Sequence, residues 1–115
     1  MNSNEMAKLI YNALDDKKAE DITIIDIRGI SVLADYFIVA TGDNQNQLMA
    51  MQNETDKVMH ENGINPKQIE GNRTSTWILM DYTDVIVHIF SKEDRLFYDL
   101  ERIWQDGKVI SVDEL

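Results

Sequence analysis

The sequence predicts one α/β domain, with a mixed β-sheet and three helices. Its length of 115 residues is enough for a single hydrophobic core. Apolar residues make up 43% of the chain and occur along its whole length, as in packed globular proteins. Segments with helical spacing of apolar residues alternate with short strand-like segments. The order is helix, strand, strand, helix, an optional short strand, two strands and a helix, which is typical of an α/β domain.

The first helix and the first two strands are predicted from capping and apolar spacing. Asn2, followed three residues later by Glu5, resembles a capping box and predicts a helix over residues 3–17. The isoleucine-rich segment 21–27 predicts a strand, and the mostly apolar segment 35–41 predicts a strand at the centre of the sheet. The residues that recur at helical spacing in the first helix are Met6, Leu9, Ile10, Ala13 and Leu14.

A second helix is expected after the central strand. Asp43 or Asn44 is placed to cap it, and Gly63 is placed to follow its C-terminus. Residues 69–70 are compatible with a short additional strand. The unit from residue 35 to residue 81 is expected to form a right-handed strand–helix–strand crossover. The apolar positions of this helix are Leu48, Met51, Val58 and Met59.

Two strands and a third helix complete the predicted domain, which spans residues 1–105. Segments 76–81 and 85–90 predict a hairpin joined by three residues. Ser91, with an acidic residue three positions later, predicts the start of the third helix. Because the apolar pattern fades afterwards, residues 106–115 are expected to be a mobile C-terminal tail. The predicted core face of the third helix consists of Leu96, Phe97, Leu100, Ile103 and Trp104. With three helices, one face of the sheet is expected to stay partly open for a partner.

The charge balance indicates the kind of partner. Eleven lysines and arginines stand against 21 aspartates and glutamates, so the net charge is −10. Direct binding to nucleic acid relies on basic groups that neutralise phosphates, so the overall field opposes it. An anionic membrane is disfavoured for the same reason. A basic protein is the better partner, although acidic proteins are often simply soluble.

Other features of the composition concern the compartment. The chain has no cysteine, so no disulfide and no thiolate site is expected. The longest apolar run, residues 36–40, falls far short of the roughly 20 residues that span a bilayer. The N-terminal residues 1–5 have neither the basic region nor the apolar core of a signal peptide. A cytoplasmic protein is therefore expected.

The strand-to-helix turn at residues 41–44, Thr-Gly-Asp-Asn, is the nearest sequence to a phosphate-binding loop. Free N–H groups at a helix N-terminus attract phosphates. The turn nevertheless has one glycine and lacks the lysine of a P-loop. Asp43 also places a negative charge where the phosphate would lie. A helix cap is the favoured interpretation.

Carboxylates and a histidine are the other candidates for chemistry. Asp81 and Asp84, with Asp26 and Asp35 as neighbours, could hold magnesium. Metal-binding pairs on a strand are usually spaced Asp-x-Asp, whereas this pair is three residues apart in a predicted turn. Turn formation or partner recognition is therefore favoured. His88 is interpreted as a hydrogen-bonded structural residue, because no nucleophile pattern accompanies it. No catalytic residue, metal or cofactor is expected.

Three stretches together resemble the ribosomal silencing factor family, also called Iojap-like. Residues 35–42, DYFIVATG, are similar to the family's Asp-Tyr-Phe-(apolar)₂-Ala-Thr-Gly. The second stretch is Glu-Gly at 70–71 followed by residues 77–90, WILMDYTDVIVHIF. The third, residues 98–104, is similar to the family's closing Tyr-x-Leu-Glu-x-(apolar)-Trp. The resemblance covers residues 6–104 and depends on order and spacing as well as on residue type.

The resemblance implies a function as well as a fold. Family members have a nucleotidyltransferase-like fold without the catalytic carboxylate pair. They bind the large-subunit ribosomal protein that is fourteenth in the L series, at the subunit interface. There they block joining of the small subunit, which represses translation, and several are homodimers. The resemblance thus implies a translational repressor that binds the large ribosomal subunit and forms a homodimer when off the ribosome. If the dimer used the same open sheet face, dimerisation and ribosome binding would compete.

The site residues that the resemblance carries over lie between Trp77 and Asp84. On a strand, Trp77, Leu79 and Asp81 share one face, while Met80 lies on the other. Tryptophan and tyrosine are frequent interface anchors, and an acidic rim suits a basic partner. Trp77 could equally cover the edge of the core. The predicted partner-binding residues are Trp77, Leu79, Met80, Asp81, Tyr82 and Asp84.

The sequence departs from the family pattern at two places, and two other functions are also compatible with it. Thr83 stands where family members commonly have glycine, which leaves the turn type and the reach of Tyr82 undecided. Residues 43–46 replace the small hydroxyl residues usual after Thr-Gly, which changes the helix cap. The alternative functions are a nucleotidyltransferase-type enzyme that uses Asp81 or Asp84 with magnesium, and an acidic dimeric adaptor with another basic target.

Overall fold

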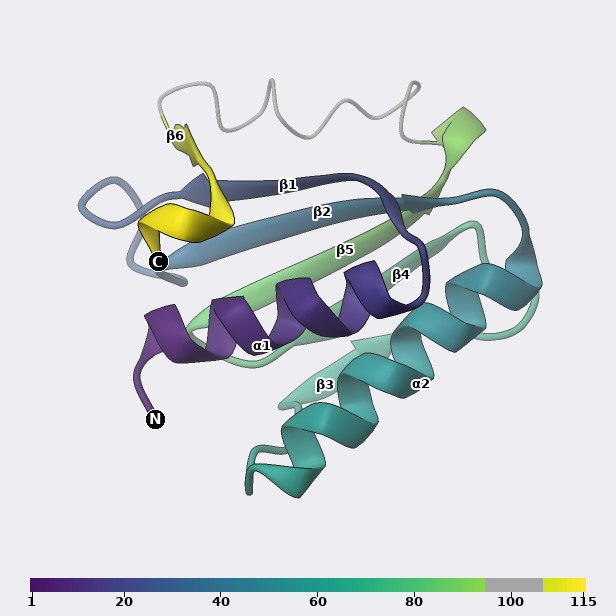
Figure 1. The fold of residues 1–115 in the computed structure, drawn as a ribbon, viewed down its shortest axis with the longest axis horizontal. Helices are drawn as coiled ribbons and strands as arrows, with labels where there is room; N and C mark the ends of the chain where they lie inside the picture. The colour runs from purple at the N-terminus through teal and green to yellow at the C-terminus, as the bar shows by residue number, and fades with distance from the viewer. Residues whose placement is uncertain (95–106) are drawn as a thin grey trace.

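Two helices cover one face of a six-stranded sheet in the computed structural model, which describes residues 1–94 and 107–115 (Figure 1). This confirms the predicted α/β class with a mixed sheet. Within the described residues, no helix is both long and apolar enough to cross a membrane. The elements are α1 Ser3–Asp16, β1 Glu20–Asp26, β2 Tyr36–Gly42, α2 Gln45–Glu61, β3 Gln68–Glu70, β4 Trp77–Asp81, β5 Val85–Ser91, β6 Lys108–Ile110 and the 3₁₀ turn η1 Val112–Glu114.

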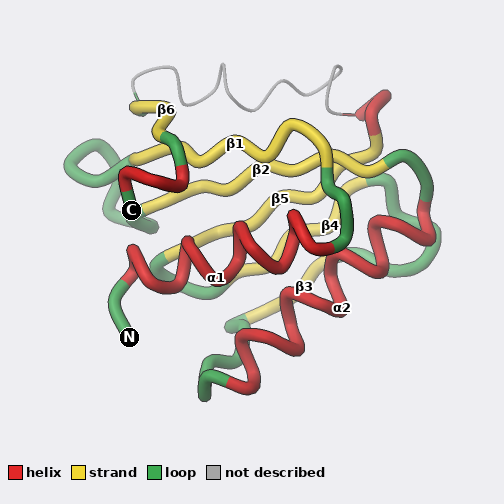
Figure 2. The backbone as a smooth tube through the Cα atoms, in the orientation of Figure 1, coloured by secondary structure: helices red, strands yellow, loops and turns green. Residues whose placement is uncertain are grey.

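The sheet has the strand order β3-β4-β5-β2-β1-β6 (Figure 2). Its only parallel pair among the described strands is β2 with β5, and all other neighbours are antiparallel. All seven residues of β2 are buried, which confirms the predicted central strand. The hairpin of β4 and β5 is confirmed too. The expected crossover from residue 35 to residue 81 is wrong, because the parallel partner of β2 is β5. The chain first forms the antiparallel pair β3–β4, so the crossover is longer than one helix.

Side-chain caps define both helices. The capping box of Asn2 and Glu5 opens α1 as predicted. Of the two candidates for α2, Asn44 is the cap, and its side chain accepts a hydrogen bond from the Gln47 backbone N–H. The buried face of α2 includes Leu48, Met51 and Met59, but Thr55 replaces Val58 in it. Thr55 lies seven residues after Leu48 and four before Met59, so it shares their face, whereas Val58 is half-buried.

The two faces of the sheet bury separate sets of side chains. Residues of α1 and α2 pack with one face of β2, β4 and β5 in the larger cluster. The opposite face carries a smaller cluster to which the loop between β1 and β2 contributes Ala34. Period-two alternation explains the division, because neighbouring residues of a strand point to opposite faces. The members of the smaller cluster are Ile25, Ile27, Ala34, Phe37, Val39 and Phe90, with Ile86 packed against them.

The C-terminal part of the chain differs from the sequence-based expectation. Residues 92–94 are helical and the Asp94 N–H donates to Ser91 Oγ, as predicted for the start of a third helix. The remainder of that helix, including its predicted core face, falls in 95–106 and lies outside the described residues. The expectation of an open sheet face stays a prediction for the same reason. Residues 108–110, expected in a mobile tail, instead form β6, which pairs with the edge of β1. The sequence did not predict this strand, because three residues are too few to show an apolar pattern.

Candidate functional site

Four of the six predicted site residues lie on β4, which divides them between the two faces of the sheet. Trp77 is 37% exposed, and Leu79 and Asp81 are half-buried on the same face. Met80 points to the other face and is fully buried beneath the helices. Asp84 is exposed in the turn after β4. The structure therefore brings Trp77, Leu79 and Asp81 together along one face and excludes Met80 from it.

Tyr82 also differs from its expected position in a polar rim. Its side chain is buried in the larger cluster with Met80, on the helix side of the sheet. Burial, followed by the charge of Asp56 on α2, raises the pKa of Tyr82. Among the described residues its hydroxyl has no hydrogen-bond partner. The sequence could not reveal this orientation, since a tyrosine in a turn is free to point either way. Tyr82 and Met80 thus support the site from the core.

Trp77 is held in place by two side chains of β5. Its indole Nε1 donates a hydrogen bond of 3.1 Å to His88 Nδ1. Its ring stacks on Phe90 with the ring centroids 5.1 Å apart. The register of the hairpin causes both contacts, because Trp77 lies opposite Phe90 and Leu79 lies opposite His88. Trp77 is therefore a pre-positioned aromatic surface of the kind that anchors protein interfaces.

His88 is a buried neutral histidine. Desolvation lowers its pKa to about 4, because a charged imidazole would lose its hydration there. Since Nδ1 accepts from Trp77, the neutral ring carries its proton on Nε2, which has no partner among the described residues. Phe37 packs edge-on against the ring at 5.0 Å. The predicted hydrogen-bonded structural role of His88 is confirmed.

The turn between β4 and β5 depends on Asp81. Its Oδ1 accepts a 2.8 Å hydrogen bond from the Thr83 backbone N–H, which confirms turn formation by this carboxylate. The Tyr82 N–H donates to the Val85 carbonyl at 3.0 Å. Thr83 has a φ of +71°, in the left-handed region where a β-branched residue is strained. Glycine, which the family resemblance leads us to expect at this position, would adopt this φ without strain.

Gly71 lets the chain pass close to the start of β4. It has a φ of +119°, and a Cβ added there would lie 3.1 Å from the Trp77 carbonyl oxygen. Any larger residue would displace the backbone that carries Trp77. The Glu-Gly pair at residues 70–71 therefore has a structural role in placing the aromatic side chain.

Asn44, Asp43 and Asp26, considered above for enzyme chemistry, have structural partners. Asn44 caps α2, and the carboxylate of Asp43 pairs with Lys92 Nζ at 2.6 Å. Asp26 accepts two side-chain hydrogen bonds from Arg28, which lower the pKa of its carboxyl. In residues 1–94 and 107–115, no three histidine, aspartate or glutamate side chains gather as metal ligands would.

Sequence reasoning missed the support that β5 gives to Trp77. The sequence predicts a hydrogen-bonded structural role for His88 but names no partner for it, although period-two alternation places His88 and Phe90 on one face. The length of the turn sets which residues of β4 and β5 lie opposite each other, and the structure has a two-residue turn, Thr83 and Asp84, in place of the expected three-residue connection. Pairing the segments outward from a three-residue connection matches Leu79 with Val87, whereas the structure extends the pairing to Tyr82 and Val85 and so places Leu79 opposite His88.

Comparison with known proteins gives consistent matches. The family model described as "Ribosomal silencing factor during starvation" matches residues 1–115. "Ribosomal silencing factor RsfS" of Bacillus subtilis is 41% identical over 113 residues, which cover 98% of this chain and 96% of that protein. A crystal structure of protein CV0518 from Chromobacterium violaceum has a TM-score of 0.88 and 35% identity, covering 96% of this chain and 92% of the other. A more distant relative, "Mitochondrial assembly of ribosomal large subunit protein 1" of Mus musculus, is 25% identical over 84% of this chain and 43% of that longer protein.

The positive φ of Thr83 leads to a prediction about stability. Replacing Thr83 by glycine should raise the free energy of unfolding by about 1 kcal/mol, because glycine adopts a positive φ without a Cβ clash. Thr83→Ala is the matched control, since it removes the β-branch but keeps Cβ, and should gain less. Urea unfolding measures both variants. Equal stability of Thr83→Gly and the unchanged protein would show that the turn is not strained.

The lowered pKa of His88 leads to a prediction about how stability depends on pH. An unfolded histidine binds a proton below a pKa of 6.5, but His88 in the folded chain does so only near 4, so stability should fall as the pH falls through this window. The expected loss from pH 7.5 to 5 is about 2 kcal/mol. His88→Asn keeps an oxygen that can accept from Trp77 and does not titrate, so it should lose this part of the dependence. An unchanged pH profile in the variant would contradict the assignment to His88.

Proposed function

Because the chain belongs to the ribosomal silencing factor family, we propose that it is a translational repressor that binds the large ribosomal subunit and blocks joining of the small one. The observation that carries the proposal is the family match over the whole chain, residues 1–115. The relatives are named as silencing factors, which makes this a family of regulatory proteins rather than enzymes. The nucleotidyltransferase-like character of the fold, without the catalytic carboxylate pair, belongs to the same proposal.

The proposed partner is the large-subunit ribosomal protein that is fourteenth in the L series, at the subunit interface. The name of the mouse relative refers to the large ribosomal subunit, which supports that choice of subunit. The net charge of −10 supports a basic partner, because opposite charges steer the two proteins together and like charges would repel them. A cytoplasmic location follows from binding to bacterial ribosomes.

The proposed contact surface is the Trp77 patch, which we define as Trp77, Leu79, Asp81 and Asp84. Its apolar end is an aromatic ring that hydrogen bonding and stacking already hold, so little side-chain freedom is lost on binding. Its other end carries two carboxylates, one half-buried and one exposed. A central apolar anchor with a charged rim is the usual anatomy of a protein interface.

Subunit joining tests the proposal directly. Purified protein, titrated against a fixed amount of large subunits before small subunits are added, should reduce the light scattering of joined ribosomes and saturate near one copy per large subunit. Saturation is expected because a single site on the large subunit is blocked. Joining that is unaffected by folded protein would reject the proposal and favour an acidic adaptor with another target.

Replacing Trp77 by alanine tests the patch. The variant should bind large subunits about thirtyfold more weakly in co-sedimentation, because a buried interface tryptophan contributes at least about 2 kcal/mol. Asn53→Ala, on the exposed surface of α2, is the control and should bind as the unchanged protein does. Thermal unfolding must show that the Trp77 variant is folded. Undiminished binding by a folded Trp77→Ala protein would remove Trp77 from the site.

A homodimer off the ribosome is part of the same proposal. If the second copy covers the sheet face that carries the Trp77 patch, dimerisation and ribosome binding compete. A covalently crosslinked dimer should then fail to co-sediment with large subunits, while the uncrosslinked protein binds. Binding by the crosslinked form would contradict the competition without affecting the repressor function.

A further inference from the structure

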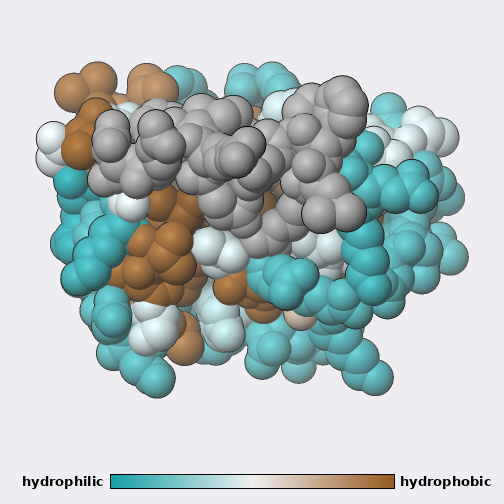
Figure 3. All heavy atoms as spheres, turned by 90° about the horizontal axis from the view of Figure 1, so that it is seen from above, coloured by the Kyte–Doolittle hydropathy of each residue, from teal (hydrophilic) through white to brown (hydrophobic). Residues whose placement is uncertain are grey.

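An exposed apolar loop projects from the end of the sheet between β1 and β2. We define the apolar loop as residues 30–33, in which Val32 is 104% exposed, Leu33 69% and Ile30 49%. Hydrophobic residues gather at this corner of the surface, seen as brown spheres at the upper left (Figure 3). Single exposed apolar residues are common, but three within four positions are not expected on a surface that only faces water.

The backbone of the apolar loop is held by hydrogen bonds. The N–H groups of Ile30 and Ser31 donate to the Ile27 carbonyl at 3.2 and 3.1 Å. Ser31 Oγ accepts from the Leu33 N–H at 3.1 Å, and Ala34 is buried in the smaller cluster at the base of the loop. The chain thus fixes this loop while leaving its largest side chains in solvent. Such a pre-formed apolar projection loses little conformational entropy when it inserts into a partner.

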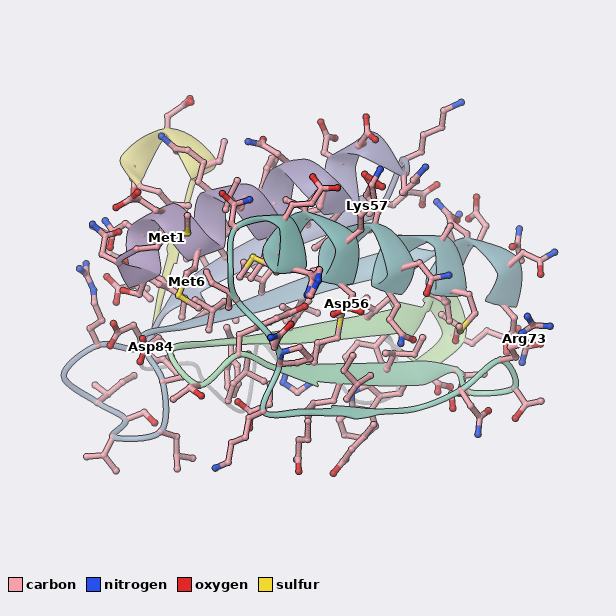
Figure 4. All side chains as sticks on the ribbon, turned by 90° about the horizontal axis from the view of Figure 1, so that it is seen from below. Met1, Met6, Asp56, Lys57, Arg73 and Asp84 are labelled. Carbon is pink, nitrogen blue, oxygen red and sulfur yellow. The ribbon has the colours of Figure 1, made fainter. Side chains whose placement is uncertain are left out.

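The apolar loop adjoins the Trp77 patch. The backbone N–H groups of Asp35 and Tyr36 donate to the Asp84 carbonyl at 2.8 and 3.3 Å. Figure 4 shows Asp84 beside the loop that joins β1 and β2. From Asp84 the turn leads back to Asp81, and Trp77 lies four residues further along β4, about 14 Å away for an extended chain. We call this path, from the apolar loop past Asp84 and Asp81 to Trp77, the strip.

The charges around the apolar loop are mainly negative. Four carboxylates lie on this side of the molecule, those of Asp26 and Asp35 beside the loop, that of Asp84 in the adjacent turn and that of Asp81 at the end of β4. Arg28 pairs with Asp26 at 2.8 Å, and Lys108 lies opposite Asp26 on β6. Lys67 is a third cation, because its backbone N–H donates to the Asp81 carbonyl at 2.7 Å, and three cations against four carboxylates still leave a net negative border. An anionic lipid surface would be repelled by that border, whereas a basic protein surface would be attracted to it.

We propose that the apolar loop is a second anchor for the basic ribosomal partner, inserting into an apolar depression that has basic side chains at its rim. The inference rests on the proposed function, because it assigns a further contact to the same complex. The Trp77 patch and the apolar loop then bind at the two ends of the strip, and the carboxylates between them meet the basic rim. Two separated anchors fix the orientation of the bound protein, which a block of subunit joining requires.

Removing the apolar side chains tests the inference. The double variant Val32→Ser/Leu33→Ser should bind purified large subunits at least about tenfold more weakly than the unchanged protein, since both side chains would be buried in the complex. Its folding should be unaffected, because both side chains are exposed. Val109→Ser is the matched control, as Val109 is an apolar residue 62% exposed on a different element, β6. Binding should be measured at several ionic strengths. The double variant should bind more weakly at each of them without a change in salt dependence, because only an apolar contact is lost. Asp84→Asn should reduce the salt dependence, because a charge is lost.

The possible results separate the inference from the function on which it rests. Weakened binding by the folded double variant, with Val109→Ser unchanged, supports the second anchor. Full binding by the double variant, or an equal loss in Val109→Ser, overturns it while the repressor function stands. If the unchanged protein itself does not bind large subunits, the proposed function fails, and the second anchor fails with it.

Discussion

The parallel pairing of β2 with β5 is the constraint on which the rest of the structure depends. It runs without interruption from Tyr36 opposite Val85 to Gly42 opposite Ser91. Parallel strands begin at the same edge of a sheet, so the loop before β2 must lie beside the turn before β5. The hydrogen bond from the Asp35 N–H to the Asp84 carbonyl is the direct result. The same pairing brings the N-terminus of α2 to the end of β5, where Lys92 reaches Asp43.

The buried His88 holds the partly exposed side chain of Trp77 in position. His88 lies in the sheet without a charge, and one of its ring nitrogens accepts from the indole of Trp77. Burying a polar ring costs free energy, and its Nε2 has no partner among the described residues. What the arrangement provides is a tryptophan that is 37% exposed and yet restrained by a hydrogen bond and by stacking on Phe90. Restraint before binding preserves affinity, because a rigid anchor has less entropy to lose.

Charge and shape select the kind of partner together. The acidic balance of the whole chain acts at a distance and accelerates encounter with a basic protein, but it does not say which part of the surface makes contact. Local structure adds that information, since the exposed apolar groups and the carboxylates of the β4–β5 turn lie on neighbouring loops. Apolar contacts then contribute affinity that salt does not screen, while the carboxylates determine orientation and rate.

The sequence by itself determined the local features. The cap at Asn2, the strand at the centre of the sheet and the hairpin after Trp77 depend on neighbouring residues, so capping and apolar spacing were sufficient to predict them. It also predicted a face that contains Trp77, Leu79 and Asp81. Only the tertiary structure decided that Tyr82 turns into the core, that β5 rather than β4 pairs in parallel with β2, and that 108–110 add an edge strand. These outcomes depend on contacts between segments far apart in the chain, and such contacts leave no periodic signal in the segments themselves.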